Sequence, residues 1–247
     1  MSPLRKPFRR RKGRFSYLLA VMIMQLLLSP WAEVSGARGR ITGLLAAGAV
    51  LCALYAVSES RRVWIAGVIL AVPAFLHRVS TPDLHSLFSL AGLGASIAFD
   101  MLITVFILQE ILQHDDISGQ TINGALCAYL TTGYAFGHLY MLVVHLYPDS
   151  FAMDTRLFHH TIPVQPDLIY YSYTTLVALG ANGIAPSARS TRCLSMIEGL
   201  LGVMYLTVLL GRLVGLHVSQ SITKASPTSR DRSETPESNE AWDAELR

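Results

Sequence analysis

The residues best suited to chemistry lie in one apolar stretch, residues 170–186, with the sequence YYSYTTLVALGANGIAP. Gly180, Asn182 and Gly183 interrupt it. Glycine and asparagine enter left-handed backbone conformations at low cost, so their carbonyl oxygens can point in directions that a helix does not allow. A short helix followed by such carbonyls can replace the hydration shell of a cation. The stretch therefore predicts a cation-coordinating loop, and a plug or surface loop that only connects two helices is the alternative.

Two carboxylates lie inside apolar segments. Glu198 is near the start of the last segment, and Asp100 is in the middle of the fourth. A charge at such a position is costly unless water or a partner meets it, so a functional role is the default expectation. For Glu198 we expect a functional role, or a pairing with the hydroxyl group of Thr174 or Thr175. For Asp100 we favour a structural pair with a Tyr or His side chain of the fifth segment.

Other chemistry is not indicated by the sequence. None of the eight histidines has the i, i+4 spacing with a third ligand nearby that a zinc site shows. The adjacent His159 and His160 could make an outer loop sensitive to pH, since imidazole titrates near neutrality. We find no phosphate-binding glycine loop, no serine nucleophile motif and no catalytic pair of carboxylates. We therefore expect neither an enzyme nor a metal site, and no cofactor other than a permeant monovalent cation.

The composition indicates that these residues are positioned by membrane helices. The chain of 247 residues is 51% hydrophobic and only 15% charged, which argues against a soluble protein. About 20 apolar residues cross a bilayer. Five stretches fit that rule and a sixth, weaker one contains Pro73: residues 15–34, 41–57, 87–108, 122–147 and 193–217, with 63–76 as the weak stretch. We predict an all-α membrane protein with six transmembrane helices and a re-entrant pore helix and filter loop between the fifth and sixth.

The flanking charges predict the orientation and the division of the chain. Residues 1–14 are strongly basic, which places them in the cytoplasm beside the membrane rather than on nucleic acid. Four accessory helices follow in residues 15–112, then a pore module in 121–217 and a disordered cytoplasmic tail in 218–247. A cleaved signal peptide is the alternative for the first apolar stretch. The fourth stretch has no Arg or Lys, so it is not a voltage sensor.

The pore module also resembles a known family. The sequence DLIYYSYTTLVALGANGIAP is similar to the pattern D-x-x-Y-F-S-F-x-T-L-T-T-L-G-Y-G-D-I-x-P of bacterial potassium-channel-family proteins, and ARSTRCLSMIEGLLGVMYLTVLLGRLVGL resembles their inner helix. The resemblance implies a homotetrameric potassium channel in the bacterial inner membrane, with both termini cytoplasmic. It implies a pore helix with Tyr170, Ser172, Thr174 and Thr175, a filter of Ala178, Leu179, Gly180, Ala181, Asn182 and Gly183, and an inner helix with Glu198, Gly199 and Gly202.

The chain departs from the family pattern where selectivity is made. Ala178 stands at the inner threonine, Ala181 at the aromatic residue, Asn182 at the second glycine and Gly183 at the acidic residue. The first change removes a coordinating hydroxyl and the last removes a carboxylate that attracts cations. We therefore expect cation conduction with weak or altered potassium selectivity. A non-conducting regulatory or assembly protein that keeps a degenerate pore framework is the alternative.

Overall fold

The computed structural model describes residues 13–34, 38–58, 61–79, 87–113, 119–154, 156–158 and 161–225. Within these ranges the chain is mostly helical. It contains the α-helices α1 (Arg14–Val34), α2 (Arg38–Val57), α3 (Arg61–Val79), α4 (Leu87–Leu112), α5 (Gly119–Leu146), α6 (Gln165–Leu176) and α7 (Arg189–Ala225), the 3-10 turn η1 (Pro148–Ser150), and the strands β1 (Phe151–Met153) and β2 (Ile184–Pro186).

Each of the six apolar stretches corresponds to one long helix, so their helical character is confirmed. Among the described residues, two helices are long and apolar enough to cross a membrane, namely α4 and the part of α7 from Arg189 to Arg212. These two helices are weak support for association with a membrane. That all six helices cross it, with α6 as a re-entrant element, stays a prediction.

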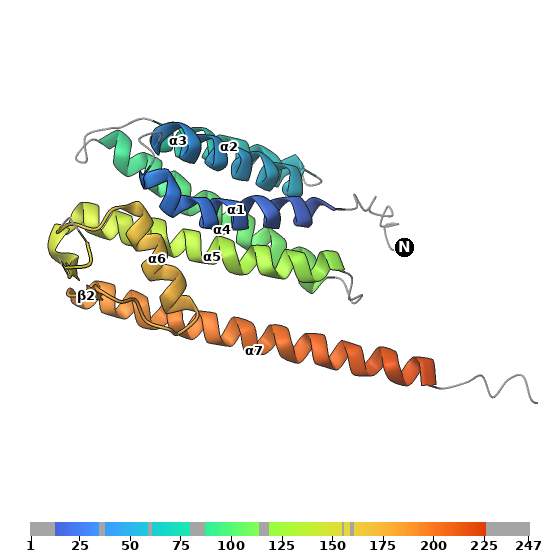
Figure 1. Ribbon diagram of the computed structural model, residues 1–247. Helices are drawn as coiled ribbons and strands as arrows, with labels where there is room; N and C mark the ends of the chain where they lie inside the picture. The colour runs from blue at the N-terminus through green and yellow to red at the C-terminus, as the bar shows by residue number, and fades with distance from the viewer. Residues whose placement is uncertain are drawn as a thin grey trace, which may run out of the picture. The chain divides into compact units, whose positions relative to one another are not determined.

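The helices α1 to α5 lie side by side (Figure 1). The helix α4 packs against α3 on one side and α5 on the other, and α1 packs against α2 and α5. The residues that α4 buries recur every three or four positions, as one face of a helix requires: Ser89, Leu93, Ser96, Asp100, Ile103, Ile107 and Ile111. A polar side chain on that face, such as Asp100, must therefore find its partner inside the bundle.

A two-stranded antiparallel sheet joins the chain after α5 to the chain after α6. Phe151 pairs with Pro186, Ala152 with Ala185 and Met153 with Ile184. Phe151 and Ile184 are buried in an apolar cluster with residues of α5 and α6. The all-α fold that we predicted did not include this sheet. The pairing depends on contacts between distant parts of the chain, which hydrophobic periodicity does not report.

The chain forms two compact units, one up to Val208 and one from Leu209 onward. The second unit contains the end of α7, which continues to Ala225. The prediction of a disordered segment from residue 218 is therefore wrong for residues 218–225. No glycine or proline lies between Gly215 and Pro227, so nothing in the sequence stops the helix there.

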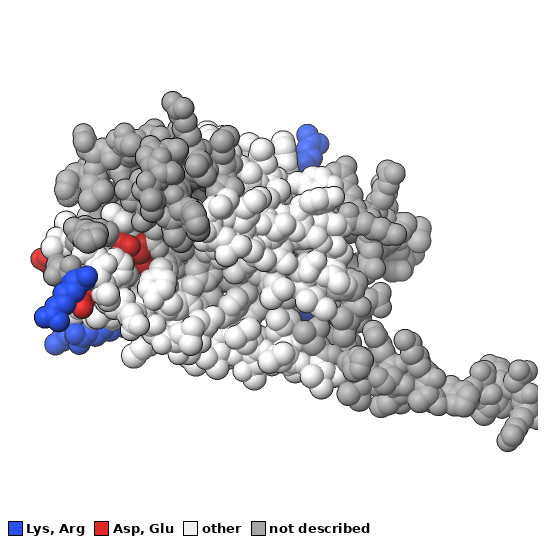
Figure 2. All heavy atoms as spheres, viewed as in Figure 1, with Lys and Arg blue, Asp and Glu red and all other residues white. Residues whose placement is uncertain are grey.

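Charged side chains on the face shown in Figure 2 lie mainly at one end, on the left, and the middle of the helices is almost free of charge there. Exposed charged residues occur in and around the sheet and at the start of α7: Asp149, Asp154, Arg156, Arg189 and Arg192. A neutral middle with charges at the ends is typical of helices that meet lipid.

Candidate functional site

Three glycines bring the short helix α6 close to α5 and α7, between which it lies (Figure 1). A Cβ atom added at Gly133 would lie 2.4 Å from the Tyr173 ring, and one at Gly137 would lie 2.9 Å from the Ile169 side chain. A Cβ at Gly202 of α7 would lie 2.0 Å from the carbonyl oxygen of Leu176. Small residues at helix contacts allow such close backbone approach. Gly202 thus permits tight packing of α7 against the end of α6.

The helix α6 begins at Gln165, two residues before Asp167. Pro166 occupies its first turn, where the missing N–H group costs nothing. The Asp167 carboxylate accepts a hydrogen bond of 2.9 Å from the backbone N–H of Val164. Asp167 therefore satisfies a backbone donor at the helix start from a position inside the first turn.

The helix α6 ends in a Schellman motif centred on Ala178. The N–H of Leu179 donates to the carbonyl of Thr174 at 2.8 Å, and the N–H of Ala178 donates to the carbonyl of Thr175 at 2.9 Å. Ala178 has a positive φ of 58°, the conformation that glycine normally provides at this position. The cost of a left-handed alanine is about 1–2 kcal/mol. The alignment with the family pattern, which placed Ala178 at the inner threonine of the filter, thus did not reveal its role in ending the helix.

The loop of residues 177–183 has a different conformational pattern from the one we predicted. Positive φ angles occur at Ala178, Gly180 (76°) and Gly183 (81°). Asn182 has no positive φ, so it does not take the left-handed conformation that asparagine allows. Leu179 is 79% exposed, and Ala181 is the partly buried member that packs against the apolar cluster.

The carbonyl groups of this loop are largely uncommitted. The Gly183 carbonyl accepts a hydrogen bond of 2.8 Å from the N–H of Asp154, which anchors the loop to the end of β1. Among the described residues, no hydrogen bond reaches the carbonyl oxygens of residues 178–182. Backbone carbonyls need a partner wherever they are removed from water. These carbonyls are therefore available to water, an ion or another chain.

Glu198 of α7 is fully buried and accepts hydrogen bonds from two helices. Tyr140 of α5 donates to its Oε2 at 2.7 Å, and Ser172 of α6 donates to its Oε1. The pore-helix partner is thus Ser172, not Thr174 or Thr175 as we had considered. Thr174 bonds instead to the carbonyl groups of its own helix, because its hydroxyl lies within reach of the preceding turn.

An aromatic cluster surrounds this carboxylate. The rings of Tyr140, Phe151 and Tyr171 meet edge to face, with centroid distances of 5.1, 5.2 and 5.6 Å. The hydroxyl of Tyr171 lies 2.6 Å from that of Ser195. Such pairs add stability beyond the area they bury. Sequence reasoning missed Tyr140 and Ser195, because only the fold brings Tyr140 to Glu198 and Ser195 to Tyr171.

The remaining expected residues have simpler environments. Tyr170 is 45% exposed, so it does not belong to the aromatic cluster. Gly199 lies over Thr175, with 3.6 Å between the position of an added Cβ and the Thr175 carbonyl oxygen. That spacing is an ordinary contact distance, so a Cβ atom would fit at position 199, whereas it would not fit at position 202.

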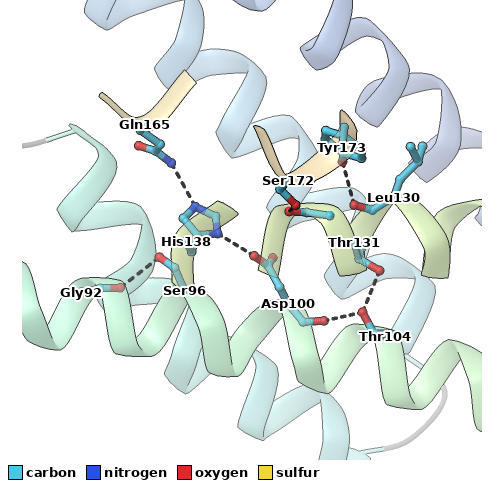
Figure 3. A network of polar contacts seen from close by, with 11 residues as sticks. Gly92, Ser96, Asp100, Thr104, Leu130, Thr131, His138, Gln165, Ser172 and Tyr173 are labelled. Carbon is cyan, nitrogen blue, oxygen red and sulfur yellow. Dashed lines mark hydrogen bonds and ion pairs between the residues drawn. The ribbon is translucent and has the colours of Figure 1, made fainter. Parts of the chain in front are cut away.

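The second buried carboxylate, Asp100, pairs with His138 of α5 (Figure 3). The His138 Nδ1 lies 2.8 Å from the Asp100 Oδ2, and the His138 Nε2 lies 3.0 Å from the amide nitrogen of Gln165. The predicted structural pair with a residue of the fifth segment is thus confirmed. The contact also links α4 to the first residue of α6.

Comparison with known protein families, curated proteins and solved structures finds no match to this chain. In the described part of the chain, no group of three or more His, Cys, Asp or Glu residues could hold a metal ion. Residues 1–12 of the basic N-terminus, His159 and His160 lie outside the described residues, whereas Arg14 is described and pairs with Glu110 at 2.5 Å.

Proposed function

We propose that this chain is a subunit of a membrane channel in which the loop of residues 177–183 lines the conduction path for a monovalent cation. One observation carries the proposal. The loop follows a short helix wedged between two long apolar helices, and the carbonyls of residues 178–182 accept no hydrogen bond from the described residues. Carbonyl oxygens presented in this way can replace water around an ion.

The surroundings of α6 support this proposal because they fix the loop from both ends. The buried Glu198 joins α7 to α6 through Ser172, and the close approach at Gly202 leaves α6 little freedom to shift. At the other end, the bond from Asp154 holds Gly183 to the sheet. A site that exchanges ligands with an ion requires such a rigid support.

A single loop supplies only part of a ring of carbonyls, so we propose a homotetramer. Large apolar side chains of α7 are exposed in one copy, including Met196 (71%), Leu200 (62%) and Val208 (64%). Lipid and neighbouring copies are the natural partners of such side chains. We place the complex in a bacterial inner membrane with six crossings per chain and both termini in the cytoplasm, as the basic N-terminus favours.

Selectivity for potassium is expected to be weak or altered. Ala178 and Gly183 both have positive φ, and an added Cβ at Gly183 would lie 2.8 Å from Leu157. A threonine at the first position and an aspartate at the second, as in the family pattern, would therefore be strained. The same observation favours the second candidate, a non-conducting regulatory or assembly protein, because the loop backbone does not suit a potassium filter.

The deciding experiment measures potassium and sodium flux into liposomes that contain the purified protein, with its oligomeric mass determined in the same detergent. Flux from a tetramer supports the channel, and the ratio of the two fluxes gives the selectivity. The variant Ala181→Tyr/Asn182→Gly restores two residues of the family pattern at positions without positive φ. Flux only in that variant supports the degenerate framework, and a silent, non-tetrameric protein in both forms refutes the channel.

A further inference from the structure

A cavity of about 40 Å³ lies among α1 to α5, next to Asp100. Its wall is mainly apolar, but five of its side chains carry oxygen atoms: Gln25, Ser96, Asp100, Thr131 and Tyr134. Asp100 is the one carboxylate among the described residues of the wall, and none of these residues is Lys or Arg. Asp100 is therefore the one residue of the described wall that can carry a negative charge, and no Lys or Arg of that wall balances it.

The hydrogen bonds of His138 show that this histidine does not cancel the charge of Asp100. Its Nε2 faces the side-chain nitrogen of Gln165 at 3.0 Å (Figure 3). With the Gln165 amide oriented as it is in the structure, its nitrogen donates and this Nε2 accepts, which assigns the ring the tautomer without a proton on Nε2. The ring proton is then on Nδ1, which donates to the Asp100 carboxylate at 2.8 Å. The imidazole is neutral, and it orients Asp100 without balancing it.

An ionised carboxylate in such surroundings needs a counter-charge. The Asp100 side chain is only 10% exposed, and His138 is almost completely buried. Burying an unbalanced charge costs several kcal/mol, which a bound cation offsets. The cavity provides room for such an ion, because about 10–15 Å³ of this kind of volume is enough for one water molecule.

We propose that this cavity binds one small monovalent cation, sodium or potassium, on the Asp100 carboxylate. The size of the cavity excludes organic ammonium groups and lipid headgroups. A single carboxylate does not suit calcium or magnesium, which take six or more oxygen ligands and usually several charged ones. The Ser96 oxygen joins the site, since its hydroxyl hydrogen points to the Gly92 carbonyl and leaves its lone pairs available, whereas the Thr131 oxygen already accepts a hydrogen bond of 2.8 Å from Thr104.

Thermal unfolding of the full-length protein in detergent tests this site. Lithium, sodium or potassium chloride replaces choline chloride at constant ionic strength, and one cation is expected to raise the wild-type Tm by about 3–6 °C at roughly ten times its dissociation constant. Asp100→Asn should remove that rise. Glu110→Gln should keep it, because this carboxylate lies on the same helix but pairs with Arg14 at 2.5 Å.

A second variant keeps the test informative even if the Asp100→Asn protein does not fold. Ser96→Val fills the cavity with methyl groups and leaves the pair of Asp100 and His138 intact, so it should also abolish the cation-dependent rise. A wild-type Tm that is the same in all four salts overturns the proposal. A rise that persists in both cavity variants assigns the cation to another site, such as the loop of residues 177–183, and also overturns it.

This site does not depend on the proposed channel function. Its readout is the difference in Tm between wild type and the two cavity variants, which needs no conduction. A protein that carries no flux but loses its cation-dependent Tm rise in Asp100→Asn would refute the channel and support the site. The opposite pair of results would refute the site and leave the channel standing.

Discussion

Gly202→Ala is the substitution for which the structure gives the strongest expectation. The new Cβ would lie 2.0 Å from the Leu176 carbonyl oxygen and 2.9 Å from its carbon. An ordinary contact between these atoms is about 3.5 Å, so α7 and α6 would have to separate by more than about 1 Å. Both atoms of Leu176 belong to the backbone, so no side-chain rotation relieves the clash. We expect a loss of about 1–3 kcal/mol or more, the usual cost of overpacking.

The assay is thermal unfolding of the purified protein in detergent, where each kcal/mol changes the Tm of a domain of this size by about 2–4 °C. Gly94→Ala is the matched control, because an added Cβ there meets no atom within 4 Å. It should be neutral or stabilising by up to about 1 kcal/mol, from helix propensity. A Gly202→Ala protein as stable as the Gly94→Ala protein would show that α6 and α7 do not approach as closely as described.

Two further substitutions test the ends of α6. Ala178→Gly should raise the free energy of unfolding by about 0.5–1 kcal/mol, because the strain of the left-handed alanine that it removes exceeds the entropy that glycine adds to the unfolded chain. The control Ala185→Gly, in the extended strand β2, should lower the free energy of unfolding. Equal effects of the two substitutions in thermal unfolding would contradict the Schellman assignment. Glu198→Leu should be less stable than Glu198→Gln by about 1 kcal/mol or more, since leucine accepts no bond from Ser172 or Tyr140; a leucine variant of equal or higher Tm refutes this.

The sequence predicts the helices well because their apolar stretches are long and uninterrupted. A structural partner for Asp100 among the Tyr and His side chains of the next helix followed from the cost of a buried charge, and the structure shows that this partner is His138. These inferences depend on residues close in sequence or on one strong energetic rule. They needed no knowledge of how the helices pack.

The rest of the site depends on long-range contacts. Ser172 and Tyr140 are ordinary residues of their helices until the fold brings them to Glu198. Ala178 shows a different limit. Glycine is the expected residue at the end of a helix, and Gly180 is available two places later, yet the structure uses Ala178. The choice of helix end is decided by the carbonyls of Thr174 and Thr175, which sequence rules do not weigh.

The polar contacts also change the role of the first four helices. The sequence predicted only that they are accessory to the pore module. The hydrogen bonds that join His138 to Asp100 and to Gln165 connect α4 to the first residue of α6 (Figure 3). A chain without residues 15–112 would expose His138, which is 1% exposed in the full protein, and remove its charged partner. The accessory helices are therefore part of the support of α6.

Removal of these helices should consequently disturb the region of α6 even though the pore module is intact in sequence. We expect trypsin to cut the truncated chain faster than the full-length protein at Arg189 and Arg192, which follow β2 and are exposed in both. Cleavage requires local opening, because the Arg192 side chain bonds to the Pro186 carbonyl at 3.0 Å and the sheet holds this segment in place. Equal cleavage rates would show that α5, α6 and α7 hold their arrangement without α4, and that the contact of Asp100 with His138 serves α4 only.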